Sequence, residues 1–321
     1  MPTSNLLEYL SKLPDHRMMK KTLHRLDEMV FVAICAVISG AQGWTDIVEF
    51  AHNKLEWLRR FVRLENGIPV DDTFARVLSV LSPKAFADCL FAWSQTLSQR
   101  YPGEVIAIDG KTARRSHDRK NRRNPLHLVR AWSTAQGIAL GMVKTDAKSN
   151  EITAIPELLA LLELRGAIVT LDAMGCQTAI AEQVIRQGGD YVLAVKDNQP
   201  SLHEDLQEFF TTARTHRFSG VEHSFAEEVD GDHGRIETRR CWATECLQTL
   251  RAPTRWFGLK SIALIERVRL INGVTSVEQA YYITSLSANA TQIAQAVRSH
   301  WTVENSCHWV IDVNFNEDKA G

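Results

Sequence analysis

The chain has 321 residues, of which 45% are hydrophobic and 23% are charged, and its formal net charge is −1. This composition is typical of a globular protein and excludes fibrous and low-complexity chains. A length above 300 residues predicts two or three domains. The six cysteines lack paired metal-ligand spacing, which favours ordinary thiols in a reducing cytoplasm over a disulfide framework.

The first part of the chain, residues 1–97, predicts an all-helical N-terminal domain. Its longest apolar run, residues 29–40, is too short to span a bilayer and predicts a buried helix, so we expect no membrane association. Apolar residues at helical spacing over residues 44–58 predict a second helical segment. Asp71 or Asp72 is expected to cap a later helix.

From Glu104 onward the pattern changes to strands. Three strands in succession predict an antiparallel meander, and the following alternation of helix and strand predicts parallel pairing. The expected elements cover residues 105–110, 126–134, 138–145, 152–164, 167–171, 177–187 and 191–195. This order is that of the ribonuclease-H-like fold, which we therefore predict for residues 98–197 together with residues 287–321.

Residues 198–286 break that rhythm. After one helix they contain several β-like segments, which predict a β-rich insertion. A final helix is expected from residue 289 to about residue 309, with Ser287 or Asn289 as its N-cap. The predicted fold class is thus α/β: a ribonuclease-H-like catalytic core with a β-rich insertion, preceded by an all-helical N-terminal domain.

Two aspartates stand at the ends of apolar strands. Asp109 ends VIAID and Asp172 ends IVTLD, and strand ends at one edge of an α/β sheet are where such folds place their chemistry. Each aspartate alone also fits a simpler role, as a turn former beside Gly110 or as a helix cap before Gly175. Their occurrence on two strands that neighbour each other in this fold favours a functional site.

Glu304 on the final helix supplies a third carboxylate. By three-and-four spacing it shares a helix face with other side chains, namely Val297, His300, Trp301, Cys307 and His308. A carboxylate buried on such a face needs a metal ion or a cationic partner. Arg298 is the alternative partner.

Three converging carboxylates without clustered His or Cys form an oxygen-only site, which suits Mg²⁺ or Mn²⁺. Two ions about 4 Å apart activate a water or a 3′-hydroxyl and stabilise the leaving oxygen of an in-line displacement. The predicted reaction at Asp109, Asp172 and Glu304 is phosphodiester cleavage and strand transfer.

A localised basic segment follows Asp109. Residues 111–130 contain eight Lys and Arg residues and one acid. Lys111, Arg114 and Arg115 are expected to contact the DNA phosphate backbone, which contributes affinity without sequence choice. The alternative is a solvated basic loop.

At these residues the sequence resembles the DDE superfamily of insertion-sequence transposases, specifically the H-repeat-associated branch. The resemblance spans essentially the whole chain. It is carried by the segments LPDHR, IPVDDTFARVL, VIAIDGKTARRS, VTLDAMGCQ, YVLAVKDNQP, DHGRIETRR and HWTVENSCHWVIDVNFNED. The resemblance implies Asp109, Asp172 and Glu304 as the metal-binding triad of a ribonuclease-H-like core. Its implied partner is double-stranded DNA, at element ends and target, and we expect a homodimer on DNA.

The chain departs from the family pattern around Glu304. Related transposases carry a tyrosine, an arginine and a lysine at the positions of Val297, His300 and Ile311, so those DNA-contacting roles do not carry over. His300 is expected to hydrogen-bond phosphate or the metal shell instead. Lys196 and Asn198 are further candidates for DNA contact, with a surface turn as the alternative.

Family members usually continue well beyond NFNEDKAG, so the resemblance implies a truncated copy in which activity is lost or reduced. Two alternatives to an active transposase therefore stay open. One is a non-catalytic DNA-binding remnant or regulator, and the other is a structure-selective nuclease without transposition. For each of them the expected location is the bacterial cytoplasm, with nucleoid association when DNA is bound.

Overall fold

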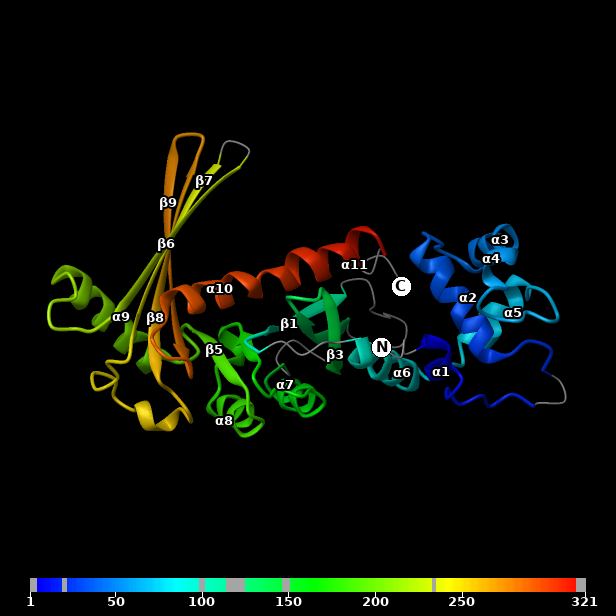
Figure 1. Cartoon of the computed structure of the whole chain (residues 1–321), viewed down its shortest axis with the longest axis horizontal. Helices are drawn as coiled ribbons and strands as arrows, with labels where there is room; N and C mark the ends of the chain where they lie inside the picture. Colours follow the sequence, from blue (N-terminus) through cyan, green and yellow to red (C-terminus); the bar gives the residue numbers. More distant parts are fainter. Residues whose placement is uncertain are drawn as a thin grey trace. The chain divides into compact units, whose positions relative to one another are not determined.

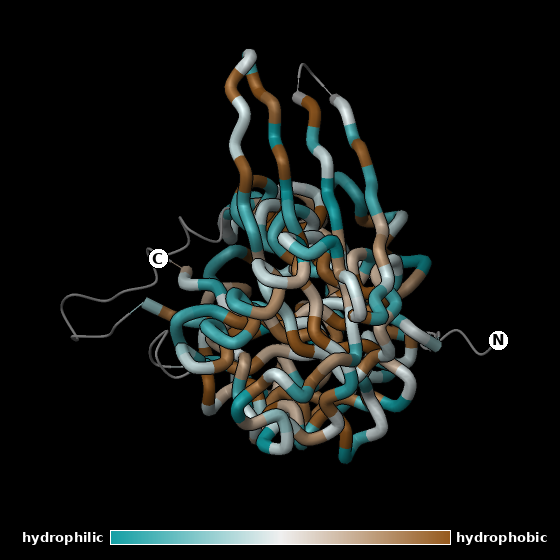
Figure 2. The backbone as a smooth tube through the Cα atoms, turned by 90° about the vertical axis from the view of Figure 1, so that its left-hand side faces the viewer, coloured by the Kyte–Doolittle hydropathy of each residue, from teal (hydrophilic) through white to brown (hydrophobic). Residues whose placement is uncertain are grey.

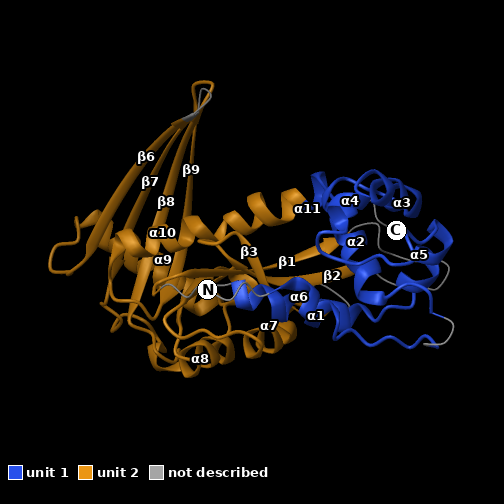
Figure 3. Cartoon of the chain, turned by 45° about the vertical axis from the view of Figure 1, so that its right-hand side comes forward, with its two compact units in different colours: residues 1–99, 311–317 blue, residues 100–310, 318–321 orange. Residues whose placement is uncertain are grey.

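The computed structural model describes residues 5–18, 22–97, 102–113, 125–145, 151–232 and 235–315. The chain divides into two compact units (Figure 3), residues 1–99 with 311–317, and residues 100–310 with 318–321. Within the described ranges, no helix is both long enough and apolar enough to cross a membrane.

Every regular element described between residues 5 and 97 is a helix. These helices are α1 (Leu6–Leu10), α2 (Leu26–Ile38), α3 (Trp44–Asn53), α4 (Leu55–Leu58), α5 (Asp71–Leu78) and α6 (Pro83–Leu97). Their apolar faces enclose a core that contains the fully buried Leu10, Met29, Leu58 and Phe74. The apolar run at residues 29–40 therefore lies within and just beyond the buried helix α2.

Two local predictions in this unit were wrong. Val70, not an aspartate, is the N-cap of α5. Asp71 and Asp72 instead lie in the first helical turn, where a carboxylate interacts favourably with the positive end of the helix dipole. The helical segment predicted over residues 44–58 is interrupted at Lys54, which separates α3 from α4.

The second unit contains one nine-stranded sheet (Figure 1), in the order β3-β2-β1-β4-β5-β9-β8-β7-β6. Strands β1 and β4, and β4 and β5, pair in parallel, while all other neighbours are antiparallel. The strands are β1 (Val105–Ala113), β2 (Leu126–Ser133), β3 (Ile138–Thr145), β4 (Ile168–Leu171), β5 (Asp190–Val195), β6 (Ser224–Asp232), β7 (Arg235–Thr244), β8 (Ser261–Ile271) and β9 (Val274–Thr284). The helices after β3 are α7 (Glu151–Ala160), α8 (Thr178–Arg186), α9 (Pro200–Thr215), α10 (Ala290–His300) and α11 (Trp309–Val313). Short helical turns are η3 (Ala173–Gly175), η4 (Pro253–Arg255) and η5 (Val303–His308).

Strand β1 is longer than the sequence predicted. Its parallel partner β4 ends at Leu171, opposite Ile108, but its antiparallel partner β2 stays paired with it as far as Ala113. The prediction that the strand ends at Asp109 was therefore wrong. Asp109 is the first residue beyond the parallel pairing, within a strand that continues.

The β-rich segment after residue 198 is continuous with the rest of the sheet. Strand β9 pairs with β5, and β8, β7 and β6 follow outward from it. The far ends of these four strands extend beyond the helices of this unit (Figure 1). Along these far ends apolar and polar residues alternate (Figure 2).

Helices cover the two faces of the sheet. On one face α7, α8 and α9 pack against side chains such as Ile106 and Val169. On the other face α10 packs against Val105 and Ile168. Because side chains alternate along a strand, Asp109 belongs by this alternation to the face that α10 covers, and Thr170 shares it.

The helix leading to Glu304 is not regular. Asn289 caps α10 as predicted, by accepting a hydrogen bond from the Gln292 N–H. The turn η5 is a π-helix, in which the Trp309 N–H donates to the carbonyl of Glu304. The prediction of one continuous helix as far as residue 309 was therefore wrong in its geometry. π-Helical turns change the angular position of every residue that follows and recur at functional sites.

Candidate active site

Asp109 is the most buried residue of the predicted triad. Its side chain is 19% exposed, and one carboxylate oxygen accepts the Gly110 N–H at 2.9 Å. Burial, together with the charges of Asp172 and Glu304, raises the pKa of Asp109 to about 7, against the lowering effect of the Gly110 bond. The structure thus brings the three predicted carboxylates within electrostatic reach of one another.

Asp172 is exposed and follows the last residue of β4. Its side chain accepts the Gly175 N–H at 3.3 Å and so caps η3. The capping role considered from the sequence is therefore correct, and it orients the carboxylate rather than competing with a functional role. A cap uses one lone pair and leaves the other carboxylate oxygen accessible.

Glu304 is exposed, so the expectation of a buried carboxylate was wrong. The alternative ion pair with Arg298 was also wrong. Arg298 instead pairs with Glu228 and Asp230 of β6, at 2.5 and 2.9 Å. The physical reason is the π-helical geometry of η5, which turns Val303, Cys307 and His308 inward and leaves Glu304 open.

His308 is the residue of η5 that approaches the triad. Its Nδ1 lies 3.5 Å from Oδ2 of Asp109, and its side chain is 11% exposed. The sequence placed His308 on the same helix face as Glu304 but assigned it no role. That spacing did not separate the two residues, whereas the structure leaves Glu304 exposed and turns His308 inward.

His300 contacts the sheet. Its Nδ1 lies 3.0 Å from Oγ1 of Thr170, two residues before Asp172. Burial lowers the pKa of His300, and the nearby Asp172 charge opposes that effect. This bond ties the end of α10 to β4, which leaves Nε2 as the ring nitrogen for any phosphate contact.

A buried polar chain lies on the other face of β1, and the sequence analysis missed it. Nε2 of His127 lies 2.5 Å from Oε1 of Glu151, and Nδ1 lies 2.8 Å from the hydroxyl of Thr112. A Cβ at Gly110 would overlap with Glu151 and with His127. The lack of a side chain at Gly110 therefore lets His127 and Glu151 pack directly against the backbone next to Asp109.

The basic residues are distributed differently from the prediction. Lys111 is half-buried in β1, two residues beyond Asp109, and by strand alternation on its face. Arg130 is buried in β2 directly opposite Asp109, so its assignment to a basic loop was wrong. Arg114 and Arg115 lie outside the described residues.

Lys196 and Asn198 are both exposed in the turn after β5. The Asn198 amide donates to the carbonyl of Ala173, the residue after Asp172, at 2.5 Å. The turn is therefore attached beside Asp172. This arrangement is consistent with both the surface turn and the DNA-contact interpretations.

The donor chemistry fits a hard divalent cation, because all three candidate ligands are carboxylates. The charges of Asp172 and Glu304 make ionisation of the partly buried Asp109 less favourable, and a bound cation would offset this effect. The geometry is open. Among the residues that the structure describes, no group of three or more His, Cys, Asp and Glu side chains is drawn together as a metal site. Asp109, Asp172 and Glu304 would have to move closer to bind one ion in common.

Comparisons with known proteins place these features in a family. The family profile described as "Transposase DDE domain" matches residues 100–320, and the profile described as "DDE_Tnp_1-associated" matches residues 7–94. "Putative transposase YncI" of Escherichia coli O157:H7 is 43% identical over 324 residues, with 100% of this chain and 82% of the relative covered. "H repeat-associated putative transposase YhhI" of Escherichia coli K12 is 42% identical, with 99% and 85% covered.

Among solved structures, a piggyBac transposase synaptic complex with hairpin DNA aligns with a TM-score of 0.47 at 10% identity. That alignment covers 97% of this chain and 68% of the other. The assignment rests on the sequence relatives and on the family profile, which matches more than half of the chain. On these matches, the chain belongs to the DDE transposase family, and its relatives include H repeat-associated members.

Proposed function

We propose that this chain is a transposase that cuts and joins phosphodiesters at insertion-sequence ends, with Asp109, Asp172 and Glu304 as ligands of two Mg²⁺ or Mn²⁺ ions. Membership of the DDE transposase family supports a transposase-like function. The observation that supports the finer proposal is that Asp172, just after β4, and Glu304, in η5, lie near enough to Asp109 on β1 for their charges to raise its pKa. The sheet order β3-β2-β1-β4-β5 is consistent with a ribonuclease-H-like core.

The chain's own groups would orient the reaction. The Gly110 and Gly175 N–H groups each hold one oxygen of Asp109 and Asp172, so the remaining oxygens are positioned before any ligand arrives. Bound divalent ions would supply an activated water or 3′-hydroxyl and would stabilise the leaving oxygen. Because Asp172 and Glu304 are exposed, a DNA backbone can reach their carboxylates.

DNA contacts are proposed for the basic and polar groups around these carboxylates. Lys111 lies two residues after Asp109 on β1, and the turn carrying Lys196 and Asn198 is attached beside Asp172. His300 would reach phosphate through Nε2. Arg114 and Arg115, in the basic segment, would add affinity without sequence choice. The substrate is double-stranded DNA, bound by a homodimer.

The test is nicking and strand transfer on duplex DNA that carries the inverted repeats flanking the gene. We expect Mg²⁺-dependent products, and a loss of about 10³-fold or more in rate for Asp109→Asn, Asp172→Asn and Glu304→Gln. Glu182→Gln is the matched control, because this exposed carboxylate of α8 pairs only locally with Arg186. A folded protein without Mg²⁺-dependent nicking, or a fully active Asp109→Asn variant, would sink the catalytic proposal.

A second candidate is a non-catalytic DNA-binding regulator, and one observation favours it. The described His, Cys, Asp and Glu residues form no closed metal site, so an open triad is also compatible with lost chemistry. This candidate predicts that Asp109→Ala binds the inverted-repeat DNA and produces the same biological effect as the original chain. Strand-transfer product from the original chain alone would exclude it.

A further inference from the structure

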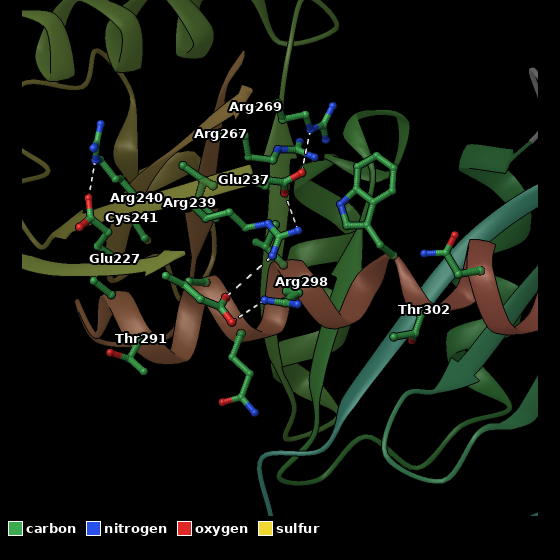
Figure 4. A pocket seen from close by; sticks show the side chains of 18 residues that line it. Glu227, Glu237, Arg239, Arg240, Cys241, Arg267, Arg269, Thr291, Arg298 and Thr302 are labelled. Atoms are coloured by element: carbon green, nitrogen blue, oxygen red, sulfur yellow. Dashed lines mark hydrogen bonds and ion pairs between the residues drawn. The ribbon is translucent and has the colours of Figure 1, made fainter. Parts of the chain in front are cut away.

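The helix that leads to Glu304 crosses a large part of the sheet. Helix α10 contacts β6, β7 and β8 as well as β1, β4 and β5. Between α10 and the outer strands lies a groove of about 960 Å³. Its charged lining consists of Glu227, Glu228, Glu237, Arg239, Arg240, Arg267, Arg269 and Arg298 (Figure 4).

Each arginine of this groove is paired with a carboxylate. Arg239 and Arg269 hold Glu237, which is 3% exposed, at 2.5 and 2.9 Å. Arg240 pairs with Glu227, and Arg267 pairs with Glu278. A phosphate entering the groove would have to displace these carboxylates, so the arginines are already neutralised within the protein.

Two contacts connect the outer strands to the Glu304 side of α10. Arg298, six residues before Glu304, reaches from α10 to Glu228 and Asp230 of β6. Figure 4 shows Arg298 extending from the helix toward the strands. Arg267 of β8, which is 9% exposed, lies over the ring of Trp301 at 5.1 Å, three residues before Glu304.

These contacts matter because η5 begins two residues after Trp301. A π-helical turn lacks the regular α-helical ladder, so the angular position of Glu304 depends on how α10 is anchored. A displacement of about 1 Å at a reacting group can cost roughly 100-fold in rate. Small changes in the anchoring of α10 would therefore lower the rate of catalysis.

We propose that the Arg298–Glu228–Asp230 ion pairs and the Arg267–Trp301 stack form a clasp that positions Glu304 relative to Asp109 and Asp172. The inference rests on the proposed function of the triad. Arg298 and Trp301 are positioning residues, which act through the helix rather than on DNA. The outer strands β6 and β8 are thereby part of the active-site architecture.

The test uses the full chain and saturating inverted-repeat DNA. Loss of an exposed ion pair shifts the equilibrium between anchored and displaced α10 by about fivefold at most. Because a displaced Glu304 also slows the reaction itself, Arg298→Ala is expected to lower kcat by about fivefold to tenfold. The Mg²⁺ concentration for half-maximal nicking should rise several-fold, while the DNA Kd measured in EDTA stays unchanged. Arg298→Lys should recover part of the rate.

Arg240→Ala is the matched control. It removes the same charge from the same groove, but Arg240 pairs with Glu227 and Glu266 and does not anchor α10. The double variant Glu228→Gln/Asp230→Asn changes charge in the opposite direction and should reproduce the Arg298→Ala defect. Hydrogen exchange of the amides of residues 303–308 should accelerate in Arg298→Ala and remain unchanged in Arg240→Ala, independently of activity.

The outcomes separate the clasp from the proposed function. Weaker DNA binding by Arg298→Ala, with tighter binding by Glu228→Gln/Asp230→Asn, would identify a phosphate site and overturn the clasp. Unchanged kcat and unchanged exchange in Arg298→Ala, with Glu304→Gln inactive, would overturn the clasp and leave the proposed function intact. If Glu304→Gln retains full nicking, the proposed function itself fails and the clasp loses its basis.

Discussion

Two carboxylates of the same sheet, Asp109 on β1 and Glu266 on β8, are largely buried but meet opposite electrostatic surroundings. Burial and the neighbouring carboxylates raise the pKa of Asp109 to about 7. Burial alone would also raise the pKa of Glu266, but a hydrogen bond from Gln279 and the charges of Arg214 and Arg240 lower it overall. Near the ends of β1 and β4, carboxylates thus lie close to one another. In the outer strands, arginines pair with the carboxylates and neutralise their charge.

This difference indicates different roles for the two regions. A network in which every carboxylate has a cationic partner holds strands and helix together. A cluster of carboxylates that destabilise one another is costly unless a cation binds, and such clusters are expected at functional sites. The following predictions test that contrast, from the largest expected effect to the smallest.

Asp109→Asn should abolish nicking and yet stabilise the metal-free protein. The folded pKa of about 7 lies above the ordinary aspartate value of 3.8, so ionisation of Asp109 removes stability as pH rises through this window. At pH 8 the variant should gain on the order of 2–4 kcal/mol in unfolding free energy, and the gain should shrink as pH falls toward 4. Urea titration in EDTA at several pH values measures it, and a destabilised variant at pH 8 would contradict the charge-cluster interpretation.

Gly110→Ala probes the reverse face of the same strand. The added methyl group would overlap with Glu151 and His127, so we expect a loss of about 1–3 kcal/mol in stability. Thermal unfolding at neutral pH measures this loss. In a Glu151→Ala background the Gly110→Ala change should cost less than it does alone, and equal costs in both backgrounds would argue against an overlap with Glu151.

Glu266→Gln should act in the opposite direction to Asp109→Asn. Because the folded pKa of Glu266 is lowered, its ionisation contributes stability above the ordinary pKa, and this contribution is lost as pH falls through the folded value. Its partners Arg214 and Arg240 are one-third exposed or more, so we expect a loss of about 1–2 kcal/mol at pH 7. Urea titration at pH 7 and pH 3 should show a smaller difference at the acidic value, and equal losses at both would contradict the ion-pair origin.

Thr170→Val tests the contact of α10 with the central strand β4. Loss of the hydroxyl that bonds His300 should cost about 1 kcal/mol in stability and leave the DNA Kd unchanged. His300→Gln should cost a similar stability and in addition weaken DNA binding several-fold, if Nε2 contacts phosphate. Equal DNA affinities for the two variants would restrict His300 to the bond with Thr170.

Much of the second unit could be predicted from local patterns. Three meander strands and the two αβ repeats lie within a few residues of their predicted positions, because apolar alternation and turn residues act locally. The contacts of the candidate site were less predictable. Arg298 pairs with Asp230, which is 68 residues away, and Arg130 lies opposite Asp109 because of the register in which β2 pairs with β1.

The sequence by itself determined which side chains are candidates and to which strand or strand end each aspartate belongs, because strand periodicity and strand ends are encoded in neighbouring residues. Only the tertiary structure decided the angular position of Glu304, the inward turn of His308 and the partners of Arg298. These features depend on a π-helical turn and on contacts between segments far apart in the chain, where competing packing energies outweigh local propensity.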